Sequence, residues 1–524
     1  MLILTLLASL GAANGYIWPS PQLDALESIR FDQDGHRAQG ISVFIEPCDL
    51  FVFSASPSGR ADSADWIRTA YHDMATHNAT DGTGGMDASI RFLEEISRPE
   101  NAGDGFSNTI NVFLAHANRY VSIADTLALA LIMSVENCGG PEIAFRGGRV
   151  DAGEPNAPGV PEPQQDLQSH IDSFARQGFT QTEMIGLVAC GHSFGGVEHA
   201  PFPDIVPDLN DPTNLKSVAH FDSTFAHFDN NVATEYISGT TQNPLVVGSN
   251  DITNSDKRIF SSDGNATMLA FANSPELFAS TCATLFARMV DTVPRGVQLT
   301  EVIKPLPVKP DSVQLVLNGG TLQLSGEVRF WNTTADPNRV VSLLWDDHVG
   351  GTHTVAMKAS GTASAVAGRY TSAWYAFNST VDPVAGITSM RFLVDGTLED
   401  QGGVGFAVQD GIFFTKTSCI TSQSPRTARF DVAVRNGLNP TRLVLEQELR
   451  DNVNRPIVVT TEISSSTQSV ALNDAYSLWS GSVVDSGAPG GFTPGAHTIR
   501  AEVGGLNITA NGGQFLSLLP PCPV

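Results

Sequence analysis

An arginine, a histidine and an aspartate stand close together in the segment WIRTAYHDMATHN, residues 66–78. Residues four positions apart lie on the same face of an α-helix, so this spacing places Arg68 and His72 side by side. Asp73 is rotated from His72 by about 100° and points elsewhere. The pattern predicts a helix with one face free for chemistry and another that is anchored. An ordinary amphipathic helix with solvated charges is the alternative for this segment alone.

Oxygen-bearing residues follow Asp73 in the segment GTGGMDASIRF. The carbonyl of Gly85, the carboxylate of Asp87 and the hydroxyl of Ser89 alternate so that they can converge with Asp73. Hard oxygen ligands of this kind suit Ca²⁺. A glycine-rich turn in which Ser89 caps the following helix is the alternative interpretation.

A second histidine ends the apolar segment EMIGLVACGHSFGG, where His192 is followed directly by a serine. Buried helical histidines are more often core residues than ligands. The segment HFDSTFAHFDNN, however, offers oxygen donors spaced like a loop that wraps a cation. The predicted donors are Ser193, Asp222, Thr224, the carbonyl of His227, and Asp229. A calcium site beside a histidine is therefore predicted twice in this part of the chain.

The elements that must position these residues are helices. Helical periodicity and Gly/Pro breaks predict helices at 63–78, 107–117, 122–136, 164–177 and 181–193. The segment VIKPLPVKP, residues 302–310, carries too many prolines for a continuous helix and is typical of a stiff linker. We therefore expect an all-α domain over residues 16–303 and a linker over residues 304–310.

The chain after this linker has the pattern of short β-strands. Alternating runs such as SVQLVL, GEVRFW and RFDVAV are separated by turn dipeptides of the Asn-Gly and Asp-Gly type. A tryptophan precedes a similar strand-like run twice, at Trp374 and Trp479. This weak repeat predicts two β-sandwich-like modules, at residues 311–418 and 419–524.

Several features predict export. The apolar run MLILTLLASLGAANG, residues 1–15, ends in small residues like a secretory signal peptide, and no later run is long enough to span a membrane. Five N-x-S/T sequons predict glycosylation, at Asn78, Asn265, Asn332, Asn378 and Asn507. The six cysteines are an even number, as expected of disulfides in an oxidising compartment. We expect a secreted, extracellular protein with no membrane partner.

The net charge and the absence of two zinc-binding motifs argue against other classes of function. The formal net charge of the 524-residue chain is −25, which disfavours binding to nucleic acid or to anionic membranes. The sequence contains no C-x-x-C pair and no H-E-x-x-H motif, which argues against structural zinc and the commonest zinc hydrolase motif.

Four separated motifs, in the same order, resemble those of the plant, fungal and bacterial haem peroxidase superfamily, nearest the secreted fungal class II enzymes. R-x-x-Y-H-D resembles the distal motif, and LVACGHSFGG resembles the proximal helix. ADTLALALIMSVENCGG, followed by GRVDAGEPN and VPEP, resembles the mid-domain block. The chain is also similar to a fungal subgroup in which ACGH and FDST recur beside extra C-terminal modules.

On the proximal side, the resemblance implies that neutral His192 ligates the iron of haem b. Asp263, in the segment SSDG, is expected to accept the other ring proton of this histidine and give it imidazolate character. Phe221 occupies the position of the aromatic residue that packs against the proximal histidine.

On the distal side, the resemblance implies that His72 moves a proton from peroxide to the leaving oxygen and that Arg68 stabilises its negative charge. Asn101 is expected to orient His72, with Glu95 six residues earlier as in the relatives. Asp73 is expected to hold the distal one of two Ca²⁺ ions. Tyr71 departs from the pattern, which usually has Phe or Trp at its position.

The resemblance pairs Cys48 with Cys138, and the pair Cys190–Cys282 then follows mainly by elimination. Cys419 and Cys522 bracket the second β module and are expected to pair across it.

The electron donor stays open. The positions of three manganese-binding acids in manganese-oxidising relatives carry Ala61, Asp65 and Glu198, so two of the three match. Leu187 stands at the position that matches the exposed tryptophan of lignin-oxidising relatives, which disfavours long-range oxidation of bulky substrates. Small phenolic donors oxidised at the haem edge are the main expectation.

Three interpretations remain at this stage. The first is a secreted haem peroxidase that reduces hydrogen peroxide. The second is a wall- or polysaccharide-binding protein whose β modules make the contact and whose haem domain is catalytically idle. The third is an all-α calcium protein without haem, which leaves His72, Arg68 and His192 unexplained.

Overall fold

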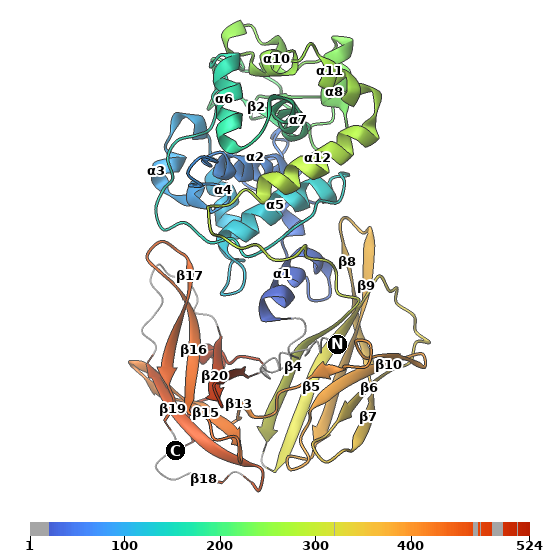
Figure 1. The fold of residues 1–524 in the computed structure, drawn as a ribbon, viewed down its shortest axis with the longest axis vertical. Helices are drawn as coiled ribbons and strands as arrows, with labels where there is room; N and C mark the ends of the chain where they lie inside the picture. Colours follow the sequence, from blue (N-terminus) through green and yellow to red (C-terminus); the bar gives the residue numbers. More distant parts are fainter. Residues whose placement is uncertain are drawn as a thin grey trace, which may run out of the picture. The chain divides into compact units, whose positions relative to one another are not determined.

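The computed structural model describes residues 20–318, 320–464, 470–471, 473–484, 496–510 and 512–523. The predicted signal peptide, residues 1–15, lies outside the described residues. The described chain divides into two compact units (Figure 1). One unit contains residues 25–305 together with 364–370. The other contains the described residues of 306–363 and 371–524 together with 20–24.

The first unit is helical. Its helices are α1 (Pro21–Phe31, which begins before this unit), α2 (Asp62–Met74), α3 (Leu93–Ile96), α4 (Gly105–Phe113), α5 (Ile123–Asn137), α6 (Leu167–Gln177), α7 (Gln181–Gly191), α8 (Asn231–Ser238), α9 (Pro244–Val247), α10 (Ser255–Phe260), α11 (Ala266–Asn273) and α12 (Pro275–Val290). The short strands are β1 (Asp34–Gly35), β2 (Gly196–Glu198) and β3 (Val218–His220), of which β2 and β3 form an antiparallel pair.

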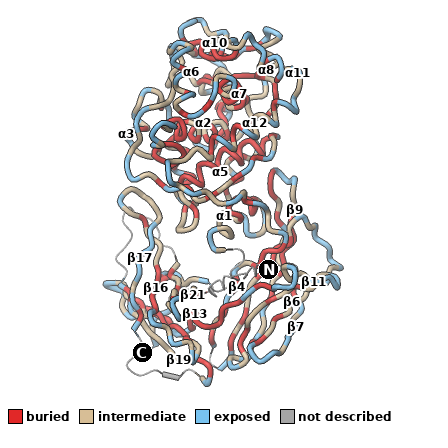
Figure 2. Tube along the Cα trace, in the orientation of Figure 1, coloured by how far each residue is buried: buried red, intermediate tan, exposed pale blue. Residues whose placement is uncertain are grey.

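Helix α5 is the centre of this unit. Every residue of α5 is buried, as expected for a helix that is apolar on all sides, and Figure 2 shows it buried along its whole length. Helix α2, which carries the distal motif, packs on α5. Helix α7 packs on α12. The helices that carry the two candidate histidines are therefore both held by the core of this unit.

Local signals fix where α7 begins and ends. Thr180 and Glu183 form a reciprocal capping box at its start. At the other end, His192 is the C-cap residue, and the disulfide Cys190–Cys282 joins this end of the helix to α12. A second disulfide, Cys48–Cys138, lies at the end of α5. Both pairs are those expected from the sequence.

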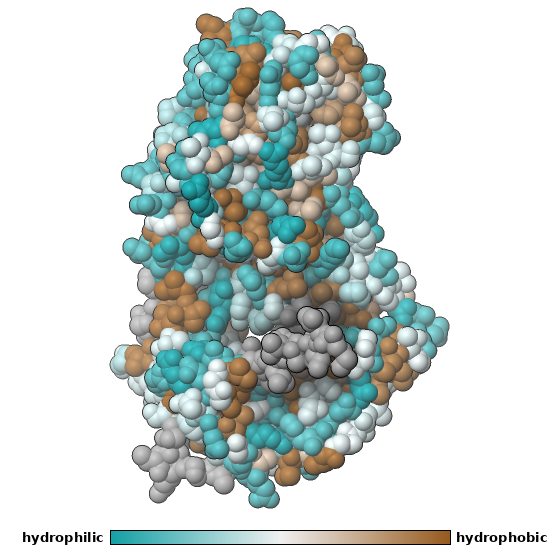
Figure 3. All heavy atoms as spheres, viewed as in Figure 1, coloured by the Kyte–Doolittle hydropathy of each residue, from teal (hydrophilic) through white to brown (hydrophobic). Residues whose placement is uncertain are grey.

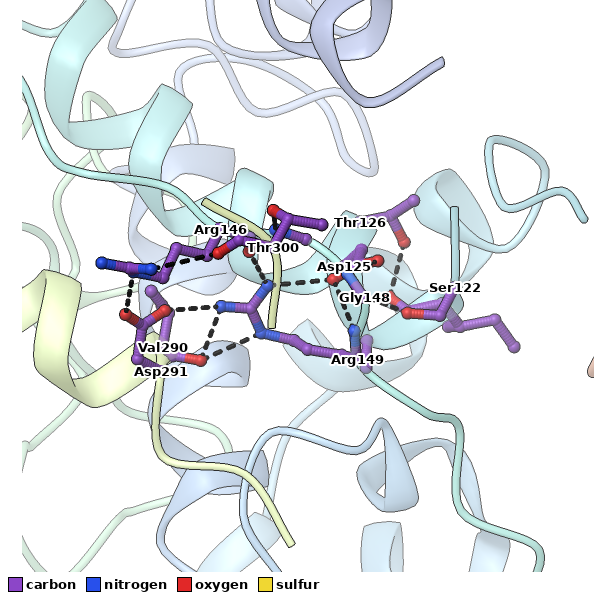
Figure 4. Close-up of polar contacts among 12 residues, drawn as sticks. Ser122, Asp125, Thr126, Arg146, Gly148, Arg149, Val290, Asp291 and Thr300 are labelled. Carbon is purple, nitrogen blue, oxygen red and sulfur yellow. Dashed lines mark hydrogen bonds and ion pairs between the residues drawn. The ribbon is translucent and has the colours of Figure 1, made fainter. Parts of the chain in front are cut away.

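The GRVDAGEPN segment has a structural role at its start. The fully buried guanidinium of Arg149 donates hydrogen bonds to the carbonyl of Val290 and to the carboxylate of Asp125 (Figure 4). Asp125 also accepts the backbone N–H groups of Gly148 and Arg149. Because a buried charge is costly unless it is paired, these contacts fix the segment firmly against α5 and α12.

The second unit consists of antiparallel sheets. The strands of its first part are β4 (Val308–Asn318), β5 (Thr321–Trp331), β6 (Val341–Asp346), β7 (Thr352–Ala356), β8 (Lys358–Ala365), β9 (Tyr370–Val381), β10 (Ser389–Val394), β11 (Thr397–Glu399) and β12 (Phe406–Ala407). They are ordered β8-β9-β5-β4 and β11-β10-β6-β7, with β12 pairing β10. Burial alternates along β6, where Val341, Leu343 and Trp345 face the core.

The second part of this unit repeats the two-sheet arrangement. Its strands are β13 (Ile412–Phe414), β14 (Cys419–Gln423), β15 (Arg426–Arg435), β16 (Arg442–Arg450), β17 (Pro456–Glu462), β18 (Val470–Ala471), β19 (Tyr476–Val484), β20 (His497–Val503) and β21 (Leu506–Thr509). The sheets have the orders β13-β15-β19-β18, with β14 pairing β15, and β17-β16-β20-β21. The disulfide Cys419–Cys522 lies in this part, as expected.

Two predicted boundaries differ from the structure. The linker predicted over residues 304–310 ends earlier, because Val308–Pro310 already belong to β4. Proline is tolerated there because β4 is an edge strand. The second β module begins before residue 419, because β13 pairs with β15 of that module. A three-residue strand is too short to show as alternation in the sequence.

A run of exposed apolar residues lies on the surface of the β unit. Ile457, Val458 and Val459 of β17 are all exposed, and hydrophobic residues gather at this place in Figure 3. Of the two tryptophans of the weak repeat, Trp374 is fully buried and Trp479 is partly buried. Among the described residues, no helix is both long and apolar enough to cross a membrane.

Candidate active site

A cavity of about 940 Å³ lies inside the helical unit and is lined by both candidate histidines, His72 and His192. Its volume is at the upper end of the range of about 300–1,000 Å³ for small-molecule and cofactor sites. Much of its lining is apolar, including Ile67, Leu187, Phe194, Val197, Phe221 and Met289. An apolar cavity with a few convergent polar groups is the usual form of a cofactor site.

The proximal histidine is held by a buried aspartate. The Nδ1 atom of His192 lies 2.7 Å from Oδ2 of Asp256, whose side chain is 1% exposed. The ring of Phe221 stacks on the His192 ring at a centroid distance of 4.0 Å, as predicted. Because the hydrogen bond uses Nδ1, Nε2 is the nitrogen left to ligate a metal.

The prediction that Asp263 accepts the ring proton of His192 is wrong, because Asp256 takes that place. Asp263 instead accepts hydrogen bonds from the backbone N–H and the hydroxyl of Thr267, at the start of α11. Asp256 lies in the first turn of the six-residue helix α10, whereas Asp263 lies beyond the end of that helix. A helix this short has no clear periodicity, so the sequence does not distinguish the two aspartates.

Asn243 is a further contact that the sequence analysis did not predict. Its amide Nδ2 donates to the same Oδ2 atom of Asp256, at 2.8 Å. Its Oδ1 atom accepts the backbone N–H of Leu245 and so caps α9. One carboxylate oxygen is therefore shared between the histidine and an amide.

The distal histidine is held by an amide. The Nδ1 atom of His72 lies 2.6 Å from Oδ1 of Asn101, and Nδ2 of Asn101 donates to the carbonyl of Glu95. Because Oδ1 is only an acceptor, the proton of the neutral imidazole is on Nδ1 and Nε2 is free to accept one. Burial and the nearby Arg68 lower the pKa of His72 to about 3. His72 is thus neutral at ordinary pH.

Arg68 is partly buried and lines the same cavity as His72. Its guanidinium donates to the carbonyls of Ala102 and Glu100 and lies over the ring of Phe106, 4.4 Å from the centroid. Burial lowers the pKa of Arg68 to about 10, so the group remains a cation at neutral pH. Tyr71 also lines the cavity and stacks on Phe174.

The acids predicted as a manganese site meet at an arginine. Arg60 lies 2.7 Å from Asp65, 2.6 Å from Asp104 and 3.2 Å from Glu198. Asp65 and Glu198 therefore converge, but on an internal guanidinium. The sequence analysis did not predict this role of Arg60, because Arg60 is not one of the three positions that match manganese ligands. No sequence pattern shows which side chain lies between two acids that are far apart in the chain. Leu187 is buried in the cavity wall, so it is not a surface position.

Four of the five predicted proximal calcium residues lie in the segment 222–229, and Ser193 directly follows the C-cap residue of α7. Asp222 accepts the backbone N–H of Thr224, and Asp229 accepts that of Asn231. The Oδ2 atom of Asp222 is buried and makes no hydrogen bond to any described residue. Burial, together with nearby Asp229, raises the pKa of Asp222 to about 7. A carboxylate oxygen of this kind fits a cation.

The other residues predicted to bind the proximal calcium are compatible with a cation beside Asp222. The hydroxyl of Ser193 donates to the carbonyl of Cys190, which leaves its lone pairs available, and the backbone of His227 turns back on Thr224. Over the described residues, no cluster of three or more His, Cys, Asp or Glu side chains has the arrangement of a metal site. The predicted proximal set contains only two carboxylates, since its other donors are hydroxyls and a carbonyl.

The predicted distal calcium residues are also together, but they face hydrogen-bond donors. Asp73 accepts the backbone N–H groups of Asp87, Ala88 and Ile90. The carboxylate of Asp87 and the hydroxyl of Ser89 face the side-chain amide of Asn156. The carbonyl of Gly85 belongs to the turn that precedes them.

Comparison with known proteins relates the helical part of the chain to peroxidases. Residues 51–274 match the family model described as Peroxidase. A WSC domain-containing protein from Arthroderma benhamiae is 38% identical over 340 residues, which are 64% of this chain and 46% of that protein. L-ascorbate peroxidase 5, peroxisomal, from Arabidopsis thaliana is 32% identical over 175 residues, 33% of this chain and 58% of that protein.

L-ascorbate peroxidase 3 from Arabidopsis thaliana is 32% identical over 130 residues, which cover 25% of this chain and 45% of that protein. The chain thus spans about half the length of the curated relatives it matches. The matched helical segment belongs to the plant, fungal and bacterial haem peroxidase superfamily.

Proposed function

We propose that the helical unit is a peroxidase that reduces hydrogen peroxide and oxidises small phenolic or similar one-electron donors. One observation carries this proposal. Two histidines line one cavity, and each has its Nδ1 atom fixed by a buried partner, Asn101 for His72 and Asp256 for His192. One histidine is arranged to move protons and the other to bind a metal.

The cavity fits haem b, the cofactor of the superfamily. Its volume and apolar lining suit a large flat ring, and His192 offers Nε2 as the ligand to iron. When bound, haem supplies the iron at which peroxide is reduced and through which electrons reach it from the donor. Asp256 strengthens His192 as a ligand, because a carboxylate that accepts the Nδ1 proton raises the basicity of the imidazole.

The protons are moved by the distal residues. Neutral His72 accepts a proton from peroxide at Nε2 and returns it to the leaving oxygen, while Asn101 keeps the ring in place. Arg68 stabilises the negative charge that develops as the O–O bond breaks. Two donor molecules supply two electrons, and with two further protons each peroxide yields two molecules of water.

The donor we propose is a small organic molecule and not Mn²⁺. Arg60 occupies the centre of the acidic cluster formed by Asp65, Asp104 and Glu198. A divalent cation at this place would compete with a bonded guanidinium and suffer repulsion from it. A small phenol needs only access to the cavity.

We further propose a secreted, extracellular glycoprotein with Ca²⁺ at the proximal loop. The orphaned oxygen of Asp222 supports the cation. Four sequon asparagines lie on exposed positions, which suits glycosylation: Asn265, Asn332, Asn378 and Asn507. Three disulfides suit an oxidising compartment.

The alternative is a wall- or polysaccharide-binding protein whose haem domain is idle. It is favoured by the relative from Arthroderma benhamiae, whose 340 aligned residues are more than the matched peroxidase segment contains and whose name includes a further domain type. Contact of the β unit with polysaccharide is a proposal on the same basis.

Replacement of His72 by alanine separates the two functions. Loss of a general acid–base group reduces turnover of peroxide with a phenolic donor by about 10²–10⁴-fold. Unchanged turnover would refute the role of His72, and absence of turnover in the wild type would favour the alternative. Binding to insoluble glucan and chitin, measured for the full chain, tests the alternative directly.

A further inference from the structure

One amide nitrogen lies at the centre of the oxygen cluster that the sequence assigns to distal calcium. The Nδ2 atom of Asn156 is 3.0 and 2.9 Å from the two carboxylate oxygens of Asp87 and 2.9 Å from the hydroxyl of Ser89. It is also 3.3 Å from the hydroxyl of Thr76. These four acceptors surround one amide NH₂ group, and three of them lie at ordinary hydrogen-bond distances.

The other carboxylate of the cluster is occupied as well. Oδ2 of Asp73 accepts the N–H groups of Asp87 and Ala88, at 3.0 and 2.8 Å, and Oδ1 accepts that of Ile90 at 3.1 Å. A carboxylate has about four lone-pair sites, so three of them already have partners. The distal residues therefore do not fit Ca²⁺, which needs six to eight oxygen ligands at about 2.3–2.6 Å.

The loop that carries Asn156 is held by hydrogen bonds at several points, so the amide has little freedom to move. Arg149 fixes the start of the loop against α5 and α12 (Figure 4). Further along, the N–H of Ala152 donates to the carbonyl of Asp87, and Arg91 donates to the carbonyl of Ala152. Arg98 donates to the carbonyl of Asn156 itself.

Asn156 is also connected to the distal histidine. Its backbone N–H donates to the carboxylate of Glu95, which is fully buried. The carbonyl of Glu95 accepts from Nδ2 of Asn101, and Oδ1 of Asn101 holds the Nδ1–H of His72. A continuous series of contacts thus runs from the oxygen cluster to the imidazole.

We propose that the Asn156 amide replaces a cation in the distal oxygen cluster and that Asn156 is a positioning residue for His72, acting through Glu95 and Asn101. The helical unit then binds at most one Ca²⁺, at the proximal loop. The effect on His72 rests on the proposed peroxidase function, whereas the occupancy of the cluster does not.

Calcium content tests the occupancy. Full-length wild type and Asn156→Asp are dialysed against calcium-free buffer with and without prior Ca²⁺, and bound metal is measured by mass spectrometry. The wild type is expected to hold no more than one Ca²⁺, and Asn156→Asp one more than wild type, because a new carboxylate replaces the donor. Two Ca²⁺ in the wild type, or no extra Ca²⁺ in the variant, would overturn the replacement.

A matched control adds the same charge elsewhere in the helical unit. Asn118 accepts the N–H groups of Tyr120 and Val121 through Oδ1, which Asn118→Asp preserves. This variant is expected to bind as much Ca²⁺ as the wild type. Extra Ca²⁺ in this control would show that added negative charge alone recruits the ion and would remove the support given by Asn156→Asp.

Rescue by calcium tests the positioning role. The second-order rate of reaction with peroxide is expected to fall about tenfold in Asn156→Ala and in calcium-free Asn156→Asp, since misplacement of a catalytic group lowers the rate. Added Ca²⁺ is expected to restore Asn156→Asp and not Asn156→Ala. Equal rates in all forms would overturn the positioning role, whereas a wild type that does not react with peroxide would refute the proposed function and leave the calcium counts valid.

Discussion

The two oxygen clusters of the helical unit are built from similar residues and differ in what lies at their centres. The proximal cluster keeps a buried oxygen of Asp222 without a hydrogen bond to any described residue. The distal cluster directs Asp87 and Ser89 at the amide of Asn156. A ligand motif therefore predicts where oxygen atoms gather, whereas a residue far away in the sequence determines whether a cation is needed there.

The acidic cluster around Arg60 follows the same rule as the distal cluster. Asp65 and Glu198 match positions of a metal site, yet a guanidinium from the same chain neutralises them. Neutralisation by an internal group stabilises the fold without dependence on a metal. Two clusters are thus filled by a donor from the same chain, a guanidinium in one and an uncharged amide in the other, whereas the proximal loop fits a cation.

The largest effect is expected from Arg60→Met. Removal of one partner of a buried ion pair costs about 3 kcal/mol, at the low end of the usual range because Asp104 is half exposed. The variant is expected to bind Mn²⁺, which restores part of the lost thermal stability, whereas the wild type does not bind it. Titration calorimetry with Mn²⁺ measures this, and saturable Mn²⁺ oxidation by the wild type would contradict the account.

The second-largest effect is expected from removal of calcium from the proximal loop. A ligand present at 100 times its Kd stabilises the folded state by about 2.7 kcal/mol, so chelation should lower Tm by several degrees. Asp222→Ala is expected to remove this calcium dependence. The control is Asp263→Ala, which loses only the contact with Thr267 and should keep the dependence in full. Equal responses of both variants to chelation would show that the proximal loop does not hold the ion.

At pH 5 the rate of peroxide reduction is expected to be about 30-fold higher than it would be with a histidine of ordinary pKa. With a pKa near 3, His72 is almost wholly neutral at pH 5, whereas a histidine with the reference pKa of about 6.5 is only about 3% neutral there. The rate should therefore fall only as the pH drops toward 3, because protonated His72 cannot accept a proton. Stopped-flow measurements after a pH jump give the acidic limb, and a midpoint near 6.5 would contradict the buried, neutral histidine.

The smallest effect is expected from Asn243→Ser. Serine preserves the N-cap of α9 but removes the Nδ2 donor from Asp256, so Asp256 becomes a stronger acceptor for His192. The reduction potential of the haem-loaded variant should be more negative than that of the wild type. Redox titration measures it, and an unchanged or more positive potential would show that Asn243 does not tune the histidine.

Much of the site could be predicted from the sequence because its residues stand in local motifs, R-x-x-Y-H-D and LVACGHSFGG, that resemble those of a known family. Arg68 and His72 share a face of α2, and His192 stands at the end of an apolar helix that the capping box starts. Asp256 could not be distinguished from Asp263, because α10 has only six residues. Asn156 and Arg60 could not be predicted, because each acts on a cluster through tertiary contacts that no local pattern encodes.

The β unit shows the same limit on a larger scale. Alternation predicted strands and turn dipeptides predicted their ends, but β13 is too short to show a period and β4 begins within a proline-rich segment. Edge position allows Pro310 in a strand. Boundaries set by pairing partners are therefore found only once the sheet order is known.

The most direct test of the central claim is the visible absorption spectrum of the purified full chain, recorded before and after one equivalent of hydrogen peroxide. We expect a ferric Soret band that shifts on addition of peroxide. In His192→Ala the band should be lost or altered, and in His72→Ala it should be present but respond slowly. A chain that takes up no haem, or a band that His192→Ala leaves unchanged, would contradict the assignment of the cavity as a peroxidase site.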